Sequence, residues 1–482
     1  MLLDSARQTG KTWLLKEFGK NEYENIACVN FDSDPLPEEV FAGFNIPRII
    51  RALSSLTGQS ILPYKTLIIF DEVQENPLAL TSLKYFAESE LEYDICASGS
   101  LLGIGLHKGT GFPVGKVEEV SPYPMSFNEF ARAKGGEAKF DFLESSNWDE
   151  ISMLHSDFSS LLQEYCFTGG MPEVVKTYID GQDLYKTRQI QKSILLGYEK
   201  DFSKHMPSSL LPKVNLVWSS LPSQLAKENK KFTFSSIKKG SRLKEFEEAI
   251  NWLEEARLIY KVDRCSKVGY PLKFYEEPNI FKLFPSDLGL LGCMANIDPA
   301  SIFVKGTFFA EFNGAFAEQL IAQTLIANGF APSYHAKSNS QLELDFIIQY
   351  KDSVIPIEVK LGNNTKAKSL KTVLDENPNL TALGEQIQYF TFSCWLISFT
   401  ALDLLPLNQR HGAHEHERGK LRTAGWNMGY VAHISSPRRI VLNLLYVIRA
   451  AGENAGNAKV CSACALRADP LLRSNLLHKF IN

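Results

Sequence analysis

Eight residues near the start of the chain have the types and spacing that hold a phosphate group. The segment Ser5-Ala6-Arg7-Gln8-Thr9-Gly10-Lys11-Thr12 fits the pattern Gly-x-x-x-x-Gly-Lys-Ser/Thr except at Ser5, where the pattern has glycine. Backbone N–H groups around Gly10 can cradle a phosphate, Lys11 can reach its oxygens, and the Thr12 hydroxyl can hold Mg²⁺. A helix predicted from Lys11 to Phe18 adds the positive end of its dipole. Residues 6–12 are therefore predicted to bind a nucleotide.

An acidic pair follows about 60 residues after this loop. The apolar run Thr66–Phe70 is typical of a buried parallel strand, and it ends in Asp71-Glu72. In an ATP site Asp71 holds Mg²⁺ and Glu72 activates the attacking water. The alternative is a buried strand followed by an exposed acidic turn, but the loop upstream favours the nucleotide site.

The elements around these residues alternate between strand and helix. Strands are predicted over 26–31 and 93–97 and a helix over 77–88, which indicates a parallel sheet covered by helices. The strand ends gather at one edge of such a sheet, where ligands bind. Ser98 and Ser100 fall on this edge, where one of them can sense the γ-phosphate. A plain Ser-Gly-Ser turn is the alternative.

The middle of the chain is predicted to be helical over 136–205, with a turn at Gly169-Gly170-Met171-Pro172. Over 206–300, short helices precede strands expected around 258–260 and 272–275, which suggests a winged-helix-like region. Basic residues cluster within it, namely Lys238, Lys239, Arg242 and Lys244. They are candidates for contact with DNA, although a solvated basic face is the favoured interpretation.

A second constellation lies in residues 301–372. Glu318 falls on a predicted helix, Asp345 on a predicted strand, and Glu358 and Lys360 on its predicted hairpin partner. Glu358 and Lys360 are two apart and so share one strand face. Two carboxylates and a lysine can bind Mg²⁺ and activate water for phosphodiester cleavage. This Asp…Glu-x-Lys pattern is that of restriction-endonuclease-like folds, but a structural version without cleavage is preferred.

The composition indicates a protein of the cytoplasm. Eight cysteines in 482 residues suggest reduced thiols rather than a disulfide scaffold. The opening Met-Leu-Leu-Asp is unlike a secretion signal. The longest uncharged apolar stretch, Tyr389–Leu402, has 14 residues, fewer than the roughly 20 of a membrane helix. No membrane association is therefore expected.

The two ends of the chain look unusual. Only Met1–Leu3 precede the loop as a strand, so we expect the first domain to be clipped at its start. Residues 410–482 carry 11 Lys+Arg against 4 Asp+Glu, in a chain of net charge −4. Metal binding by His411, His414, His416, Cys461 and Cys464, or nucleic-acid binding by this basic tail, is less favoured than a divergent or frame-shifted segment over 373–482.

Ten ordered segments resemble a large bacterial and archaeal family of AAA-type ATP-binding proteins that carry a C-terminal domain similar to an endonuclease. The segments are Arg7–Thr12, Phe70–Gln74, Ser98–Ser100, Pro113–Val117, Tyr123–Phe127, Gly169–Glu173, Tyr198–Asp201, Trp252–Ala256, Phe281–Leu283 and Asp287–Leu291. The resemblance covers roughly residues 1–372. Ser5 departs from the family pattern, which has glycine at this position. We expect the turn there to need a backbone conformation that serine tolerates less well than glycine.

The resemblance implies ATP and Mg²⁺ as ligands, with phosphate contacts from Lys11, metal contacts from Thr12 and Asp71, and Glu72 as base. The expected fold is α/β. It comprises a P-loop ATPase domain over 1–135, a helical extension over 136–205, a winged-helix-like region over 206–300 and an endonuclease-like module over 301–372.

The most favoured function is an AAA-type ATPase that acts as a switch or motor, with assembly into a homo-oligomer also considered. The alternatives are an ATP-gated nuclease that acts on DNA and a nucleotide-binding interaction module without turnover.

Overall fold

The computed structural model describes residues 1–34, 36–100, 115–135, 155–303, 313–337, 342–361, 368–377, 380 and 391–392. The first part of the expected helical extension, 136–154, lies outside these residues. So do the candidate ligands of the tail, His411, His414, His416, Cys461 and Cys464. Within the described part of the chain, no helix is long and apolar enough to cross a membrane.

The N-terminal segment forms a five-stranded parallel sheet, which confirms the α/β fold predicted for it. The strands are β1 (Leu2–Asp4), β2 (Asn25–Asn30), β3 (Thr66–Asp71), β4 (Asp94–Gly99) and β5 (Glu119–Val120). Their order is β2-β3-β4-β1-β5, and every pair is parallel. Strand β4 lies between the strand that leads into the loop and the strand that ends in Asp71. The carboxyl ends of β1, β3 and β4 therefore meet at one edge.

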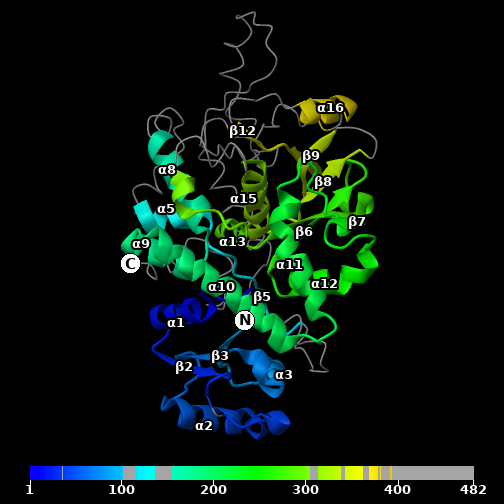
Figure 1. Cartoon of the computed structure of the whole chain (residues 1–482). Helices are drawn as coiled ribbons and strands as arrows, with labels where there is room; N and C mark the ends of the chain where they lie inside the picture. Colours follow the sequence, from blue (N-terminus) through cyan, green and yellow to red (C-terminus); the bar gives the residue numbers. More distant parts are fainter. Residues whose placement is uncertain are drawn as a thin grey trace, which may run out of the picture.

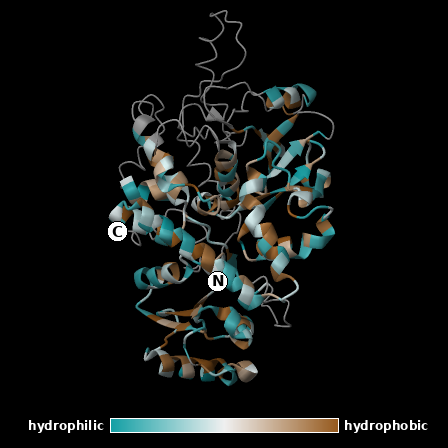
Figure 2. Cartoon of the chain, viewed as in Figure 1, coloured by the Kyte–Doolittle hydropathy of each residue, from teal (hydrophilic) through white to brown (hydrophobic). Residues whose placement is uncertain are grey.

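Helices cover both faces of this sheet. Successive side chains of each strand point to opposite faces, so apolar residues on both faces need to be covered. On one face, Leu67 and Ile69 pack with α1 (Lys11–Glu22). On the other, Ile68 and Phe70 pack with α2 (Ile46–Thr57) and α3 (Pro77–Glu88). Apolar colouring runs through the strands, whereas the helices around them are mixed (Figure 2). The sheet is therefore a buried platform for residues at its strand ends.

A group of helices lies between this sheet and the elements that follow in the chain (Figure 1). It contains α5 (Phe127–Gly135), α8 (His155–Thr168), α9 (Pro172–Gly181) and the long α10 (Leu184–His205). Helix α10 runs from these helices along the carboxyl side of the parallel sheet, where it meets the loop at residues 5–12.

The remaining described elements build a second, mixed sheet of order β10-β9-β8-β6-β7. Its strands are β6 (Ile259–Cys265), β7 (Glu276–Pro285), β8 (Ser333–Ala336), β9 (Glu343–Tyr350) and β10 (Ser353–Ile357). The helices around it are α11 (Leu211–Leu225), α12 (Leu243–Glu255), α13 (Leu288–Met294), α15 (Asn313–Ala327) and α16 (Lys368–Glu376). Strands β11 (Lys360–Leu361) and β12 (Thr391–Phe392) form a separate pair. Segments on both sides of residue 300 thus share one sheet.

Two strand predictions in this region were wrong in detail. Residues Leu272–Tyr275 form a 3₁₀ helix instead of a strand. Alternation would have placed Leu272 and Phe274 on the same face, yet Leu272 is buried and Phe274 is 82% exposed. The hairpin partner of β9 ends at Ile357 rather than Lys360, because the Val359 N–H donates to the Asp345 side chain instead of continuing the strand ladder.

The predicted Gly-Gly turn lies between α8 and α9 and packs tightly against the start of α13. Gly169 has φ +67°, and a Cβ added there would lie 2.2 Å from Oδ1 of Asp287. The Gly170 N–H donates to the other carboxylate oxygen of Asp287 at 2.6 Å. This turn also positions Pro172, whose Cγ would lie 3.5 Å from a Cβ added at the loop residue Gly10.

Candidate nucleotide-binding site

The loop over residues 5–12 joins β1 to α1 and lies at the carboxyl edge of the parallel sheet. Gly10 caps α1 with φ +85°, and no side chain caps the first N–H groups of this helix. Backbone donors without a side-chain cap at a helix start are suited to an anion. The second left-handed position of the loop is Gln8, with φ +65°.

Ser5 does not carry the strain expected of it. It is not among the described non-glycine residues with positive φ, so its backbone needs no glycine. Its hydroxyl is instead 2.6 Å from that of Thr9, which donates to the Ala6 carbonyl. Serine at the first position therefore takes part in bonds that hold the loop together.

Lys11 is buried and points back into the loop. Its ammonium donates to the carbonyls of Ser5 and Ala6 at 2.9 and 2.8 Å. Burial lowers the pKa of Lys11 to about 8, while the nearby carboxylates Glu72, Asp4 and Asp71 act in the opposite direction. A phosphate at this position would supply the negative charge that a buried ammonium lacks.

Three donors converge on Asp71 at the end of β3. The Thr12 hydroxyl donates to both of its carboxylate oxygens at 2.9 and 2.8 Å. Ser98 donates to Oδ1 at 2.6 Å and Asn30 donates to Oδ2 at 3.0 Å. The expected metal residues Thr12 and Asp71 thus lie in direct contact, and their hydroxyl and carboxylate oxygens are ligands that suit Mg²⁺.

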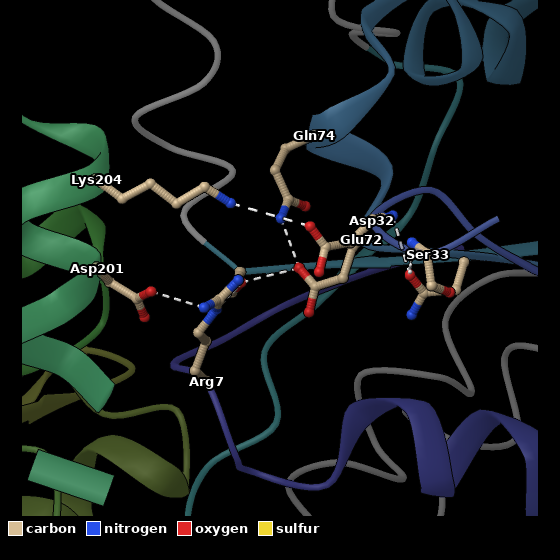
Figure 3. Close-up of polar contacts among 9 residues, drawn as sticks. Arg7, Asp32, Ser33, Glu72, Gln74, Asp201 and Lys204 are labelled. Carbon is tan, nitrogen blue, oxygen red and sulfur yellow. Dashed lines mark hydrogen bonds and ion pairs between the residues drawn. The ribbon is translucent and has the colours of Figure 1, made fainter. Parts of the chain in front are cut away.

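Glu72 and Ser100 form a second contact beside the first. Ser100, just after β4, donates to Oε2 of Glu72 at 3.0 Å, and Gln74 donates to the same oxygen at 2.5 Å. Glu72 itself adopts a left-handed conformation with φ 50°, which turns the backbone sharply where β3 ends. Figure 3 shows Glu72 facing Gln74 and the Arg7 side chain.

Two neighbours of the site were missed by the sequence-based selection. Asn30 ends β2, and polar residues at the carboxyl ends of parallel strands are candidates for ligand contact, which is the signal that points to it. Gln74 falls in the segment Phe70–Gln74 that carries the family resemblance, but its contact depends on the turn at Glu72. Ser98 and Ser100 both reach the acidic pair, one to each carboxylate.

The second constellation is only partly brought together. Asp345 on β9 and Glu358 after β10 lie on neighbouring segments, and each accepts a backbone N–H, from Val359 at 2.7 Å and Leu370 at 3.0 Å respectively. The side chain of Lys360 lies outside the described residues. Among those described, no group of three or more His, Cys, Asp or Glu side chains is placed to hold a metal ion.

Glu318 makes different contacts from those expected of a metal ligand. It is buried on α15, where Lys230 and Lys282 lie 2.7 and 3.2 Å from its two oxygens. Lys282, fully buried on β7, also pairs with Glu343 at 2.6 Å. Burial favours the neutral acid, but Lys282 and Lys230 lower the pKa of Glu318. Ammonium groups satisfy this carboxylate, which supports a structural role.

Comparison with known protein families finds a match for the first part of the chain. Residues 1–131 match an AAA domain. This match supports the predicted AAA-type ATP-binding relationship for the parallel-sheet segment that carries the loop. Residues 159–301 match a domain of unknown function, DUF8612, and residues 313–390 match another, DUF4143.

Among solved structures, the chain is similar to a Walker-type ATPase of Pyrococcus abyssi. The two share 15% sequence identity with a TM-score of 0.37, over 61% of this chain and 90% of that one. A search of curated proteins finds no match.

Proposed function

We propose that the chain is an ATPase that binds ATP with Mg²⁺ at the loop 6–12 and uses hydrolysis to switch the conformation of its C-terminal part. The observation that carries this proposal is the convergence of Thr12, Asn30 and Ser98 on Asp71, directly beside the phosphate loop. The arrangement supports the proposal, because a nucleotide bound on the loop would have its outer phosphates near this hydroxyl and this carboxylate.

The roles of the side chains follow from their positions. The α1 N–H groups and Lys11 would bind the phosphates, and Thr12 with Asp71 would hold Mg²⁺. The metal would neutralise charge on the outer phosphates. Glu72, ordered by Ser100 and Gln74, would accept a proton from the attacking water. We place this reaction in the cytoplasm, as the composition predicts.

The alternatives differ in what the nucleotide does. A nucleotide-binding module without turnover would use the same loop but would not need Glu72. An ATP-gated nuclease would need the carboxylates of the second constellation to be available to bind a metal ion. The contacts of Glu318 with Lys230 and Lys282 favour a structural role for this residue instead. Neither alternative is preferred.

Binding of ATP to the full chain tests the proposal. Titration with ATP and Mg²⁺ is compared for the wild type, Lys11→Ala and Lys16→Ala, which changes an exposed lysine on the same helix. Removing the phosphate lysine should weaken binding by at least about ten-fold, the effect of a lost charge-assisted hydrogen bond, whereas Lys16→Ala should bind as the wild type does. Equal affinities of all three would rule out the loop as the ATP site.

A further inference from the structure

Arg7 makes contacts that phosphate binding by the loop backbone does not explain. Its Nε donates to the Ser100 hydroxyl at 3.1 Å, and that hydroxyl donates to Glu72. Its Nη1 lies 2.6 Å from Oδ1 of Asp201, a residue 194 positions later on α10. Figure 3 shows the guanidinium between Glu72 on one side and Asp201 on the other. One side chain thus joins the expected γ-phosphate end of the site to a distant helix.

Helix α10 holds Arg7 at a second point. The Tyr198 hydroxyl donates to the Arg7 carbonyl at 3.0 Å. Tyr198 and Asp201 are three residues apart and therefore lie on one face of the helix. Since α10 fixes both the backbone and the guanidinium, the direction of the Arg7 side chain depends on this helix.

The Arg7–Asp201 pair is expected to persist when a nucleotide binds. Asp201 is only 7% exposed, so removing Arg7 would leave a buried carboxylate with only the weaker charge interactions of His205 and Lys204. A guanidinium has five N–H donors in a fixed fork and can serve a carboxylate and a phosphate at the same time. Arg7 can therefore reach a phosphate beside Ser100 and Glu72 while Asp201 holds its other edge.

We infer that Arg7 binds the terminal phosphate of ATP from within its own chain, and that Asp201 on α10 is the positioning residue that aims it. This inference rests on the proposed ATP-binding function and adds a residue that distinguishes ATP from ADP. Because ADP lacks the terminal phosphate, only ATP gains the Arg7 contact. By reciprocity, ATP must strengthen the docking of α10 on the loop more than ADP does.

Helix α10 also contacts the helices that follow it, so a difference between its ATP-bound and ADP-bound docking can reach them. Phe202, next to Asp201, packs edge-on against Trp218 of α11 and Trp252 of α12, with ring centroids 5.8 and 5.4 Å apart. Tighter docking of α10 on the loop therefore acts directly on the buried core of the 206–300 region.

Binding measurements on the full chain test the inference. ADP and an ATP analogue with a non-hydrolysable β,γ-imido bond are titrated with Mg²⁺ into the wild type, Arg7→Lys, Asp201→Asn and Lys192→Ala. Lys192 is the matched control, because it is an exposed lysine of the same helix, nine residues before Asp201. The wild type and Lys192→Ala should prefer the analogue. The other two variants should lose at least about ten-fold of that preference and bind ADP nearly as the wild type does.

Hydrogen exchange supplies a readout that a merely structural role would not move. The analogue should protect the amides of α10 in the wild type more than ADP does, and Asp201→Asn should abolish this difference. Arg7→Lys and Asp201→Asn change the two ends of the same pair, so poor folding of one variant leaves the other to decide. If both retain the preference for the analogue, the inference is wrong while the proposed function stands. If the wild type binds neither nucleotide, the proposed function fails and the inference fails with it.

Discussion

Lys11 is held as a buried ammonium among carbonyl groups, a state that phosphate would stabilise. Its pKa is lowered to about 8, mainly by burial, so a growing fraction of the protein carries a neutral Lys11 above that pH. Phosphate contact favours the charged form. Nucleotide binding and protonation of this one side chain are therefore linked.

We predict that ATP binding takes up protons at pH 8.5 and weakens as the pH rises further, by up to about ten-fold per pH unit. Calorimetry in two buffers of different ionisation enthalpy measures the uptake directly. The same titrations at pH 7 are the control, because Lys11 is already charged there and little uptake is expected. Binding without proton uptake at pH 8.5 would show that Lys11 does not meet the phosphates.

The Gly-Gly turn and the first turn of α13 form a unit around Asp287. This buried carboxylate accepts the N–H groups of Gly170 and Leu290 at 2.6 and 2.9 Å. Burial raises the pKa of Asp287 to about 6, although these backbone donors act against the shift. The folded protein therefore keeps a proton on this group that the unfolded chain has already released.

This predicts a specific dependence of stability on pH. Between about pH 4 and pH 6 the folded state binds more protons than the unfolded state, so the contribution of Asp287 to the free energy of unfolding falls as pH rises, by about 3 kcal/mol at most. Asp287→Asn should lack this fall. Urea unfolding of both proteins across pH 4–7 measures it, and parallel curves would contradict the assigned environment of Asp287.

A second prediction at this scale concerns Gly169. Its φ of +67° and the closeness of Asp287 leave no room for a side chain. Gly169→Ala should lower the free energy of unfolding by more than about 1 kcal/mol. Gly181→Ala is a suitable control in the same urea series, because an added Cβ there meets nothing within 4 Å. Equal stability of the two variants would contradict the tight packing of this turn.

The sequence predicted elements well where a pattern is local. Apolar runs located β3 and β4, and the loop motif placed Lys11 at the start of α1. Prediction from the sequence failed where tertiary contacts determine the local structure. The segment Leu272–Tyr275 has strand-like composition, but exposure of Phe274 accompanies a helical turn. The parts of the site that a motif carries were predicted. The Arg7–Asp201 pair was not, because it joins residues 194 positions apart that no local pattern connects.

At the scale of the whole molecule, the phosphate loop lies against the later part of the chain rather than apart from it. Ala6 belongs to the apolar cluster of α9–α12, and Asp4 just before the loop pairs with Arg257 after α12 at 3.3 Å. Pro172 lies near Gly10, since a Cβ added at Gly10 would be 3.5 Å from the Cγ of Pro172. A change in the loop therefore reaches the helices directly, as a switch requires.

The charged cluster around Glu318 gives a prediction at the same scale, because it ties α15 to β7 and to Lys230 beyond α11. Glu318→Gln would leave two buried ammonium groups with fewer partners, and we expect it to lower the free energy of unfolding by about 3 kcal/mol. Glu247→Gln, at an exposed position of α12, should change it by less than about 0.5 kcal/mol. Similar urea midpoints for both variants would contradict the structural role of Glu318.

Release of phosphate from ATP by the full chain, with Mg²⁺ and at steady state, tests the central claim most directly. The wild type should hydrolyse ATP, and Glu72→Gln should still bind ATP but release phosphate at least about 100-fold more slowly, because it lacks the base. Hydrolysis by Glu72→Gln at the wild-type rate would contradict the role of the site. A wild type that binds ATP without releasing phosphate would make the chain a nucleotide-binding module rather than an ATPase.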